Sequence, residues 1–290
     1  MRELRIEIGQ STDVGRKRTV NEDNLGLLVP TDDEQRRRIG ALFIVADGMG
    51  GHAKGEVASA LAVTTVTQTY LRTETPTLEE RLANALREAN AVIWDEAGRQ
   101  LEAAGMGTTI VCGVVVNDEL LVANAGDSRA YLVRHRQPRQ LTRDHSWVGE
   151  MVAAGRITVA EARRHKMRNV ITRCLGGRAD LEVTTYPREQ LIPGDALVLC
   201  TDGLWGTTAD HEIALLVSQF SPQVAADRLV ALANERGGPD NITVLVVRVR
   251  GEEDDASTLS LQSFDDDATL TDSDETLRGV GYDLRQLPNR

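Results

Sequence analysis

The chain has 290 residues, which suits one large α/β domain followed by a tail as well as it suits two domains. Hydrophobic residues make up 41% of it and aromatic residues only 3%, so aliphatic side chains must fill the core, and an aromatic platform for stacking nucleic-acid bases is not expected. The formal net charge of −11 argues against binding to nucleic acid or to an anionic membrane.

The negative charge is concentrated after residue 250. Residues 251–290 contain 11 acidic and 3 basic residues, a net charge of −8, which leaves −3 for residues 1–250. This composition predicts a domain over 1–250 and a disordered acidic tail over 251–290. In the tail, Thr269, Thr271, Ser273 and Thr276 lie among acidic residues, where a kinase or a phosphothreonine-binding partner could act. A solvated tail that only aids solubility is the alternative.

The cysteine usage indicates a reducing compartment. Cys112, Cys174 and Cys200 are odd in number and far apart, and none forms a Cys-x-x-Cys pair. The first residues carry no apolar segment of signal-peptide length, and no stretch approaches the roughly 18 apolar residues of a membrane span. We therefore expect a cytoplasmic, monomeric protein.

In the first half of the chain, apolar patterning predicts a few strands and two helices. Strands are expected at residues 4–8, 25–29 and 41–47, helices at 56–70 and 78–101, and a charged loop at 32–38.

In the second half, consecutive strands at 108–116, 120–124 and 129–134 form a meander, which favours an antiparallel sheet. The polar segment 146–167 reads as a helical insertion. Further strands are expected at 181–186, 196–200 and 242–249, and helices at 212–220 and 223–235. Strand-rich ends with paired helices predict an α+β fold rather than a βαβ repeat.

The stretch LFIVADGMGGH, residues 42–52, joins a buried strand to a glycine-rich turn. Asp47 ends the strand and can offer a carboxylate oxygen to a hard cation, and Gly48 can offer its carbonyl. A turn in which Asp47 caps the next helix is the alternative.

Acidic residues recur at the ends of other predicted strands. Each alone is compatible with a turn or a cap, but an antiparallel sheet can bring several strand ends to one edge, where bound cations would relieve their repulsion. An all-oxygen set favours Mg²⁺ or Mn²⁺ over Zn²⁺. These residues are Glu22, Asp23, Asp127, Asp202 and Asp240.

Such a set suits hydrolysis of a phosphate ester. Two cations bridged by one carboxylate and sharing a water would activate that water for in-line attack on phosphorus. Arg18, four residues before Glu22, could hold the phosphate, or it could belong to a solvated basic run with Arg16 and Lys17.

Other phosphoryl-transfer motifs are missing from the sequence. No cysteine is followed six positions later by arginine, as a thiolate phosphatase requires. There is no Gly-x4-Gly-Lys-Ser/Thr loop, no kinase-like His-Arg-Asp, and no Gly-x-Gly-x-x-Gly opening a helix after the first strand.

The ordered motifs resemble the PPM (PP2C-like) family of metal-dependent Ser/Thr protein phosphatases, in its bacterial form, over about residues 5–250. They are RTVNEDN, VADGMGGH, GTT, AGDSRAY, LTRDHS, NVITRCLGG, PGDALVLCTDGLWG and GPDNITVLVV. The resemblance implies a central sandwich of two antiparallel sheets flanked by pairs of antiparallel helices, in four layers α/β/β/α. It also implies a flap over about 146–167 that shapes substrate access.

The resemblance also assigns roles. Asp47 would bridge two Mg²⁺ or Mn²⁺ ions, with Asp202 and Asp240 completing one and the Gly48 carbonyl the other, which Glu22 would hold through a water. Asp127 would bind a weaker third ion with Asp202. Asp23 and Asn241 would support these ligands, and Arg18 would bind phosphate.

One position departs from the family. Eukaryotic members carry a histidine after the Asp-Gly pair as a candidate general acid, but Met49 occupies that position here. His52 could substitute for it, a structural role for His52 is the alternative, and a metal-bound water could serve as the acid.

The resemblance implies a signalling phosphatase that acts on phosphoserine and phosphothreonine in proteins, with Ser/Thr kinases and their substrates as partners. The alternatives are a non-catalytic regulatory module and a hydrolase of small phosphorylated metabolites.

Overall fold

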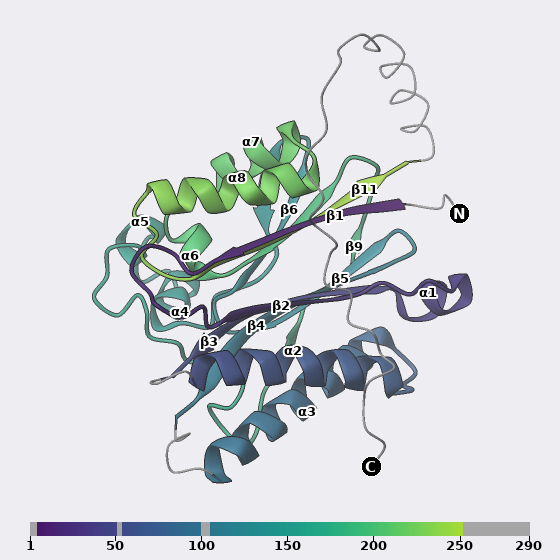
Figure 1. Cartoon of the computed structure of the whole chain (residues 1–290), viewed down its shortest axis with the longest axis horizontal. Helices are drawn as coiled ribbons and strands as arrows, with labels where there is room; N and C mark the ends of the chain where they lie inside the picture. The colour runs from purple at the N-terminus through teal and green to yellow at the C-terminus, as the bar shows by residue number, and fades with distance from the viewer. Residues whose placement is uncertain (1–4, 51–53, 100–104, 252–290) are drawn as a thin grey trace, which may run out of the picture. The chain divides into compact units, whose positions relative to one another are not determined.

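The structure, a computed structural model, describes residues 5–50, 54–99 and 105–251. Two antiparallel sheets lie face to face (Figure 1). The first has the strand order β1 (Arg5–Asp13), β11 (Ile242–Arg250), β10 (Ala196–Cys200), β6 (Arg129–Arg134), β7 (Gln137–Gln140). The second has the order β2 (Asp23–Leu28), β3 (Ala41–Met49), β4 (Gly107–Val116), β5 (Glu119–Ala125), β8 (Thr184–Thr185), and β9 (Glu189–Gln190) also pairs with β5.

Helix pairs cover the outer faces of both sheets. Helices α2 (Lys54–Arg72) and α3 (Leu78–Arg99) lie against the second sheet, and α7 (Asp210–Gln219) and α8 (Pro222–Glu235) against the first (Figure 1). A short helix, α6 (Asp202–Trp205), follows β10 directly. The predicted four-layer α+β fold is confirmed.

Aliphatic side chains fill three hydrophobic layers, one between the sheets and one under each helix pair. Strand β4 is buried at all ten positions because it is central in its sheet and covered on both faces. Phe43 and Leu245 belong to the layer between the sheets, and Leu86 belongs to the layer under the α2–α3 pair. This burial, through the hydrophobic effect, fixes the strand ends that carry the polar residues.

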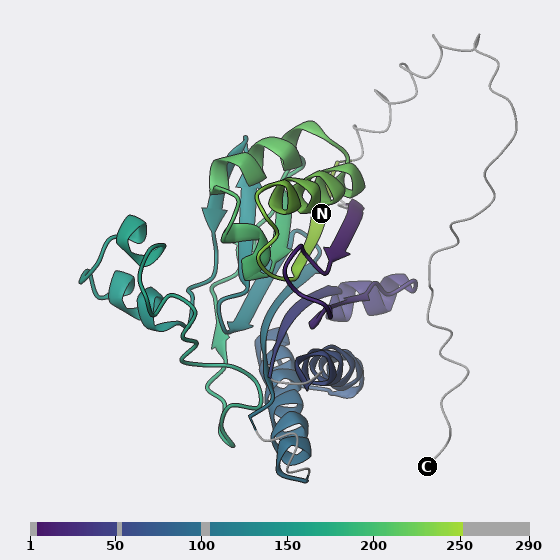
Figure 2. The same ribbon diagram turned by 60° about the vertical axis from the view of Figure 1, so that its left-hand side comes forward.

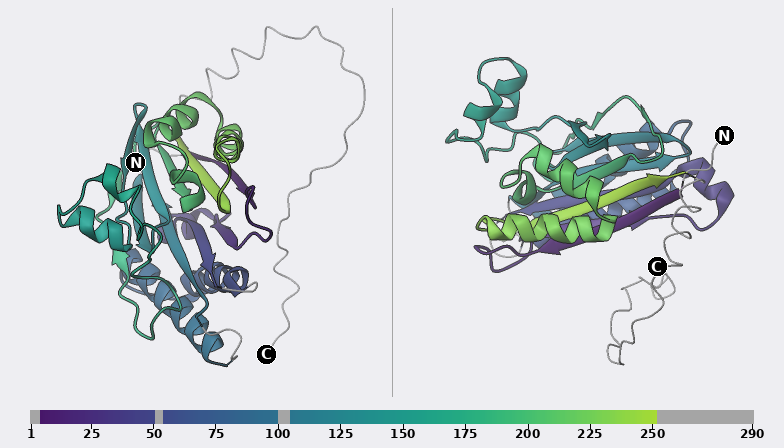
Figure 3. Two further views of the ribbon diagram at one scale, coloured as in Figure 1. Left: turned by 90° about the vertical axis from the view of Figure 1, so that its left-hand side faces the viewer. Right: turned by 90° about the horizontal axis from the view of Figure 1, so that it is seen from above.

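The segment predicted as a helical insertion lies outside the sandwich. It contains α4 (Trp147–Ala153) and α5 (Val159–Ala162), which stand apart from the sheets (Figures 2 and 3). Ser146 caps α4 by accepting a hydrogen bond from the Gly149 N–H, and Gly155, with φ +66°, separates the two helices. We call residues 146–167 the flap.

The charged segment 32–38 forms a helix, so the loop predicted there is wrong. Helix α1 (Asp33–Ile39) begins at Asp32, whose side chain accepts a hydrogen bond from the Gln35 N–H. Acidic residues occupy its first turn and arginines its last, which complements the helix dipole, and Gly40 ends it with φ +69°.

The predicted meander is only partly right. Strands β4 and β5 pair, but β5 and β6 belong to different sheets because the chain crosses between them at residues 126–128. Gly126 allows the crossing: its φ is +117°, and a Cβ there would lie 2.4 Å from Cβ of Thr109. The strand expected at 181–186 shrinks to Thr184–Thr185, and β1 continues to Asp13.

The structure also bears on the cysteines, on membrane-spanning helices and on the tail. All three cysteines are free thiols. Among the described helices, none combines the length and apolarity that a membrane crossing requires. The predicted tail falls almost entirely outside the described residues, since only residue 251 of it is described.

The close contact at Gly126 predicts that an added side chain destabilises the fold more there than at a glycine in open space. Gly155→Ala, at positive φ in open space, should lower the free energy of unfolding by about 1 kcal/mol through backbone strain. Gly126→Ala adds a collision with Thr109 and should cost roughly 2–4 kcal/mol. Chemical denaturation measures both, and equal losses would show that Thr109 does not constrain the crossover.

Candidate functional site

Strand ends from both sheets meet at one edge of the sandwich. In the β2–β3 register Asp23 lies directly opposite Asp47. The Thr201 hydroxyl, at the end of β10 in the other sheet, donates a 2.9 Å hydrogen bond to Asp23 Oδ2 and accepts one from the Thr243 N–H. A buried chain of polar contacts therefore joins the two sheets beside Asp47.

Asn241 fixes Glu22 and Asp240 at the same edge. Its Oδ1 accepts a 2.8 Å hydrogen bond from the Glu22 N–H, and its Nδ2 donates to the carbonyls of Val14 and Val20, both at 2.9 Å. One buried amide thus holds the loop before β2 against the start of β11. The contact lies beside Glu22, one of the predicted metal ligands.

Two glycines let the backbone approach closely around Glu22. The Gly48 N–H donates to the Glu22 carbonyl at 3.1 Å, and a Cβ on Gly48 would lie 2.0 Å from the Gly55 carbonyl oxygen. A Cβ on Gly55 would lie 2.6 Å from Glu22 Oε1. Any side chain at either position would push the start of α2 away from β3.

Asp127 and Asp202 approach this edge from the second half of the chain. Asp127 is buried and follows β5, while Asp202 is the first residue of α6. Trp205, at the other end of α6, donates from Nε1 to the Asp127 carbonyl at 3.0 Å. The residue before Asp127, Gly126, is bound by His145, whose Nδ1 accepts from the Gly126 N–H at 3.2 Å.

Arg18 lies at the mouth of the cluster, with 48% of its side chain exposed. Its Nη2 is 2.9 Å from Asp240 Oδ2 and its Nη1 is 3.7 Å from Glu22 Oε2. Partial burial alone would lower the pKa of Arg18, but the Asp240 bond and the charges of Glu22 and Asp47 raise it above its ordinary value. The guanidinium therefore stays charged beside the carboxylates.

The carboxyl groups strongly influence one another. Burial, followed by the charge of Asp23 and of the other aspartates, raises the pKa of Asp47 well above its ordinary value. Burial and the charge of Asp202 do the same to the pKa of Asp127. The pKa of Asp23 rises to about 7 and that of Asp202 to about 6, each mainly through burial. Negative charge is therefore costly at this edge.

Some of these oxygens lack protein partners. Within the described ranges, the buried Oδ1 atoms of Asp23 and Asp202 accept no hydrogen bond. Among the same residues, no three acidic, histidine or cysteine side chains form a closed set of metal ligands. Asp240 instead turns its carboxylate toward Arg18 and the Asn241 N–H. The strand ends therefore converge at this edge, while the Asp240 carboxylate is bound by Arg18 and the Asn241 N–H.

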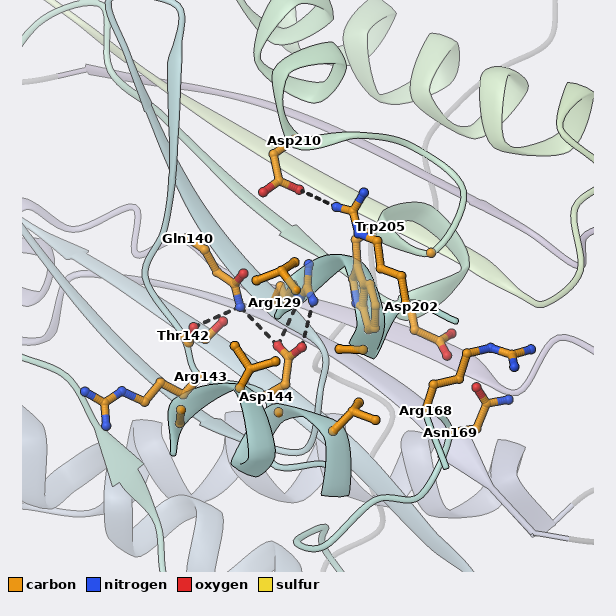
Figure 4. Close-up of a pocket in the computed structure, with 18 residues that line it drawn as sticks. Arg129, Gln140, Thr142, Arg143, Asp144, Arg168, Asn169, Asp202, Trp205 and Asp210 are labelled. Atoms are coloured by element: carbon orange, nitrogen blue, oxygen red, sulfur yellow. Dashed lines mark hydrogen bonds and ion pairs between the residues drawn. The ribbon is translucent and has the colours of Figure 1, made fainter. Parts of the chain in front are cut away.

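A cavity of about 580 Å³ adjoins this edge, between the flap and α6 (Figure 4). Asp202, Arg168 and Asp210 are among the residues that line it (Figure 4). Its walls combine apolar flap residues such as Val148 with the indole ring of Trp205. The cavity could receive part of a molecule whose reacting group lies at the carboxylates.

The structure brings nearly all of the predicted site residues to this edge, and only His52 lies outside the described residues. The predicted residues that it places there are Arg18, Glu22, Asp23, Asp47, Gly48, Asp127, Asp202, Asp240 and Asn241. Sequence reasoning missed Thr201, His145 and Trp205, although all three lie in motifs quoted above.

The comparisons with known proteins agree with this geometry. The family model described as "Protein phosphatase 2C" matches residues 10–150. The serine/threonine phosphatase stp of Listeria welshimeri is 38% identical over 244 residues, which cover 81% of this chain and 93% of that protein.

Solved structures are similar as well. The crystal structure of the Mycobacterium tuberculosis serine/threonine phosphatase PstP/Ppp has a TM-score of 0.75 and 34% identity, covering 84% of this chain and 99% of the other. The catalytic domain of serine threonine protein phosphatase PstP in complex with 2 manganese ions has a TM-score of 0.73 and 33% identity, covering 85% and 99%. On this sequence identity and coverage, the chain belongs to the protein phosphatase 2C family.

Proposed function

We propose that this protein is a metal-dependent Ser/Thr protein phosphatase that hydrolyses phosphoserine and phosphothreonine in other proteins. The observation that carries the proposal is the convergence of acidic residues from both sheets at one edge, with Arg18 at its mouth. Relatives named as serine/threonine phosphatases support it over nearly the whole domain.

The chemistry of the cluster fits divalent cations. Burial and, after it, the charges of neighbouring aspartates raise the pKa values of these carboxyl groups, and a bound cation would offset both costs of ionisation. The unpartnered Oδ1 atoms of Asp23 and Asp202 show spare acceptor capacity, and the donors are all oxygens, which Mn²⁺ and Mg²⁺ prefer. A related PstP structure contains two manganese ions.

The proposed roles follow the resemblance described above. Asp47 would be shared by two cations, Asp202 and Asp240 would complete one, and Glu22 with the Gly48 carbonyl the other. Bound cations supply Lewis acidity and an activated water nucleophile.

This chain's own residues would orient the ligands and the substrate. Asn241 and Asp23 hold the ligands through the contacts described, and Asp127 would share a third, weaker cation with Asp202. Arg18 would exchange its carboxylate contacts for phosphate oxygens, to which a guanidinium can bind bidentately.

We further propose that the enzyme acts in the cytoplasm on proteins phosphorylated by Ser/Thr kinases. The three free thiols suit a reducing compartment. The cavity beside Asp202 suits a protein segment, since it extends from the carboxylates to the flap.

Metal dependence tests the function. Wild type should hydrolyse a phosphothreonine peptide when Mn²⁺ is present and stop when EDTA is added. Asp240→Asn should lose at least about 100-fold in kcat at saturating Mn²⁺, because it removes a charged ligand. Hydrolysis of p-nitrophenyl phosphate and of small phosphorylated metabolites is measured in parallel. Metal-independent turnover, or a preference for the metabolites, would contradict the proposal.

The phosphate-binding role of Arg18 has a matched control next to it in the chain. Arg18→Ala should lower kcat/KM for the phosphopeptide about 10- to 100-fold, the value of a charge-assisted contact. Arg18→Lys should recover only part of the loss, since an ammonium cannot form the bidentate contact. Lys17→Ala, which removes an adjacent exposed cation, is the control. If kcat/KM falls equally in Lys17→Ala and Arg18→Ala, the loss is a general effect of positive charge and Arg18 does not bind the phosphate specifically.

The raised pKa of Asp23 predicts how stability depends on pH in EDTA. Below its ordinary pKa of 3.8, Asp23 is protonated in both the folded and the unfolded chain, and its contribution to stability is fully present. This contribution is lost as the pH rises to about 7, the pKa of Asp23 in the folded protein. The asparagine in Asp23→Asn does not titrate, so the variant does not lose this stability. The unfolding free energy of Asp23→Asn minus that of wild type should therefore increase between pH 4 and pH 7, by at most about 1.4 kcal/mol per pH unit, and stay constant above pH 7.

The comparison between variant and wild type is needed because His145 acts in the opposite sense. Burial and Arg173 lower the pKa of His145 to about 4, so stability falls as pH drops below its ordinary value of 6.5. This contribution is common to both proteins and cancels. A difference that stays flat from pH 4 to pH 7 would contradict the buried, protonated state of Asp23.

A further inference from the structure

The main chain around Asp127 is held from two sides. On one side His145 makes a two-way contact: its N–H donates to the Gly126 carbonyl at 2.9 Å, and its Nδ1 accepts from the Gly126 N–H at 3.2 Å. On the other side, Nε1 of Trp205 donates to the Asp127 carbonyl at 3.0 Å. The His145 side chain therefore binds the peptide N–H of Gly126, its main-chain N–H binds the Gly126 carbonyl, and the Trp205 side chain binds the Asp127 carbonyl.

Trp205 also links Asp127 to Asp202. Both Trp205 and Asp202 belong to the one-turn helix α6, so the indole hydrogen bond ties the Asp127 peptide to the helix that begins with Asp202. After burial, the charge of Asp202 is the largest cause of the raised pKa of Asp127, so the two carboxylates lie within electrostatic range.

Arg129, which forms an ion pair with Asp144, holds the Trp205 indole in place. The Arg129 guanidinium lies 3.7 Å from the centre of the Trp205 ring. Arg129 also binds both oxygens of Asp144, at 2.9 and 2.7 Å, and these two side chains are only 12% and 13% exposed. Asp144 precedes His145 in the chain, so the two sides of the support are joined to each other.

We propose that Trp205 and His145 are positioning residues that hold Asp127 at the separation from Asp202 needed to share a divalent cation. The inference rests on the proposed function, in which these two aspartates bind the third, weaker cation. Arg129 and Asp144 brace the two positioning residues. We call the four side chains Arg129, Asp144, His145 and Trp205 the Asp127 clamp.

The clamp also meets the flap and the cavity. His145 directly precedes Ser146, the residue that caps α4. Three of its members, Arg129, Asp144 and Trp205, line the cavity of Figure 4. The side chains of the clamp therefore lie between the proposed site of the weak cation and the cavity that the flap lines.

Calorimetric titration of the full chain with Mn²⁺ tests the clamp without relying on turnover. Asp127→Asn identifies the binding event that depends on Asp127, by its loss. Trp205→Phe keeps a ring for Arg129 but removes the Nε1 donor, so this event should weaken about 5- to 10-fold, the value of one hydrogen bond. The tighter events should not change. Trp94→Phe, on the exposed face of α3, is the matched control and should bind Mn²⁺ like wild type.

His145 provides a second pair of variants. His145→Asn can place an amide oxygen near the position of Nδ1 and should retain the Asp127-dependent event. His145→Ala removes the acceptor and should weaken the event by a similar factor. Thermal melting in EDTA checks that each variant is folded, and if Trp205→Phe does not fold, the His145 pair decides by the same criterion.

Three outcomes would overturn the proposal: no Mn²⁺ event is lost in Asp127→Asn, the event is unchanged in Trp205→Phe, or His145→Asn and His145→Ala behave alike. These outcomes differ from failure of the proposed function, in which wild type binds Mn²⁺ but does not hydrolyse the phosphothreonine peptide.

Discussion

Repulsion among buried carboxylates is the constraint on which the site depends. Burial raises the pKa values of Asp23, Asp47, Asp127 and Asp202, and the charges of neighbouring aspartates raise them further. A fold that gathers these groups is less stable than one that disperses them, unless protons or cations compensate. A cluster kept at this cost to stability is typical of a functional site, and the family to which the chain belongs uses such sites for phosphate-ester hydrolysis.

The sandwich withstands this repulsion because its two sheets are joined at the charged edge by specific contacts. Thr201 connects β10 to Asp23, and Asn241 holds the loop before β2 against β11. Behind them, three aliphatic layers make the strand ends rigid. The acidic residues are therefore held by the backbone, and their carboxylates can change partners without a change of fold.

Much of this arrangement was predictable from the sequence because its signals are local. The apolar runs that became β3, β10 and β11 each lie next to an aspartate, and strand ends meet at sheet edges in any antiparallel sandwich. The quoted motifs then indicated which strand ends share the site.

Other features depend on contacts that no local pattern encodes. Trp205 binds Asp127 across 78 residues, and the crossing between sheets at Gly126 depends on the space beside Thr109. The seven residues of the short helix α1 are mostly charged and show no apolar period that predicts a helix, and its cap and dipole interactions stabilise it instead. His52, proposed as the acid, lies outside the described residues.

The central claim is that the carboxylate cluster is destabilising until cations bind. The most direct measurement is the unfolding free energy of wild type and Asp47→Asn near neutral pH, each in EDTA and in excess Mn²⁺. We predict that Asp47→Asn is the more stable protein in EDTA, because one member of the cluster is neutralised, and that only wild type gains substantially from Mn²⁺. If Asp47→Asn is less stable than wild type in EDTA and gains equally from Mn²⁺, the account is contradicted.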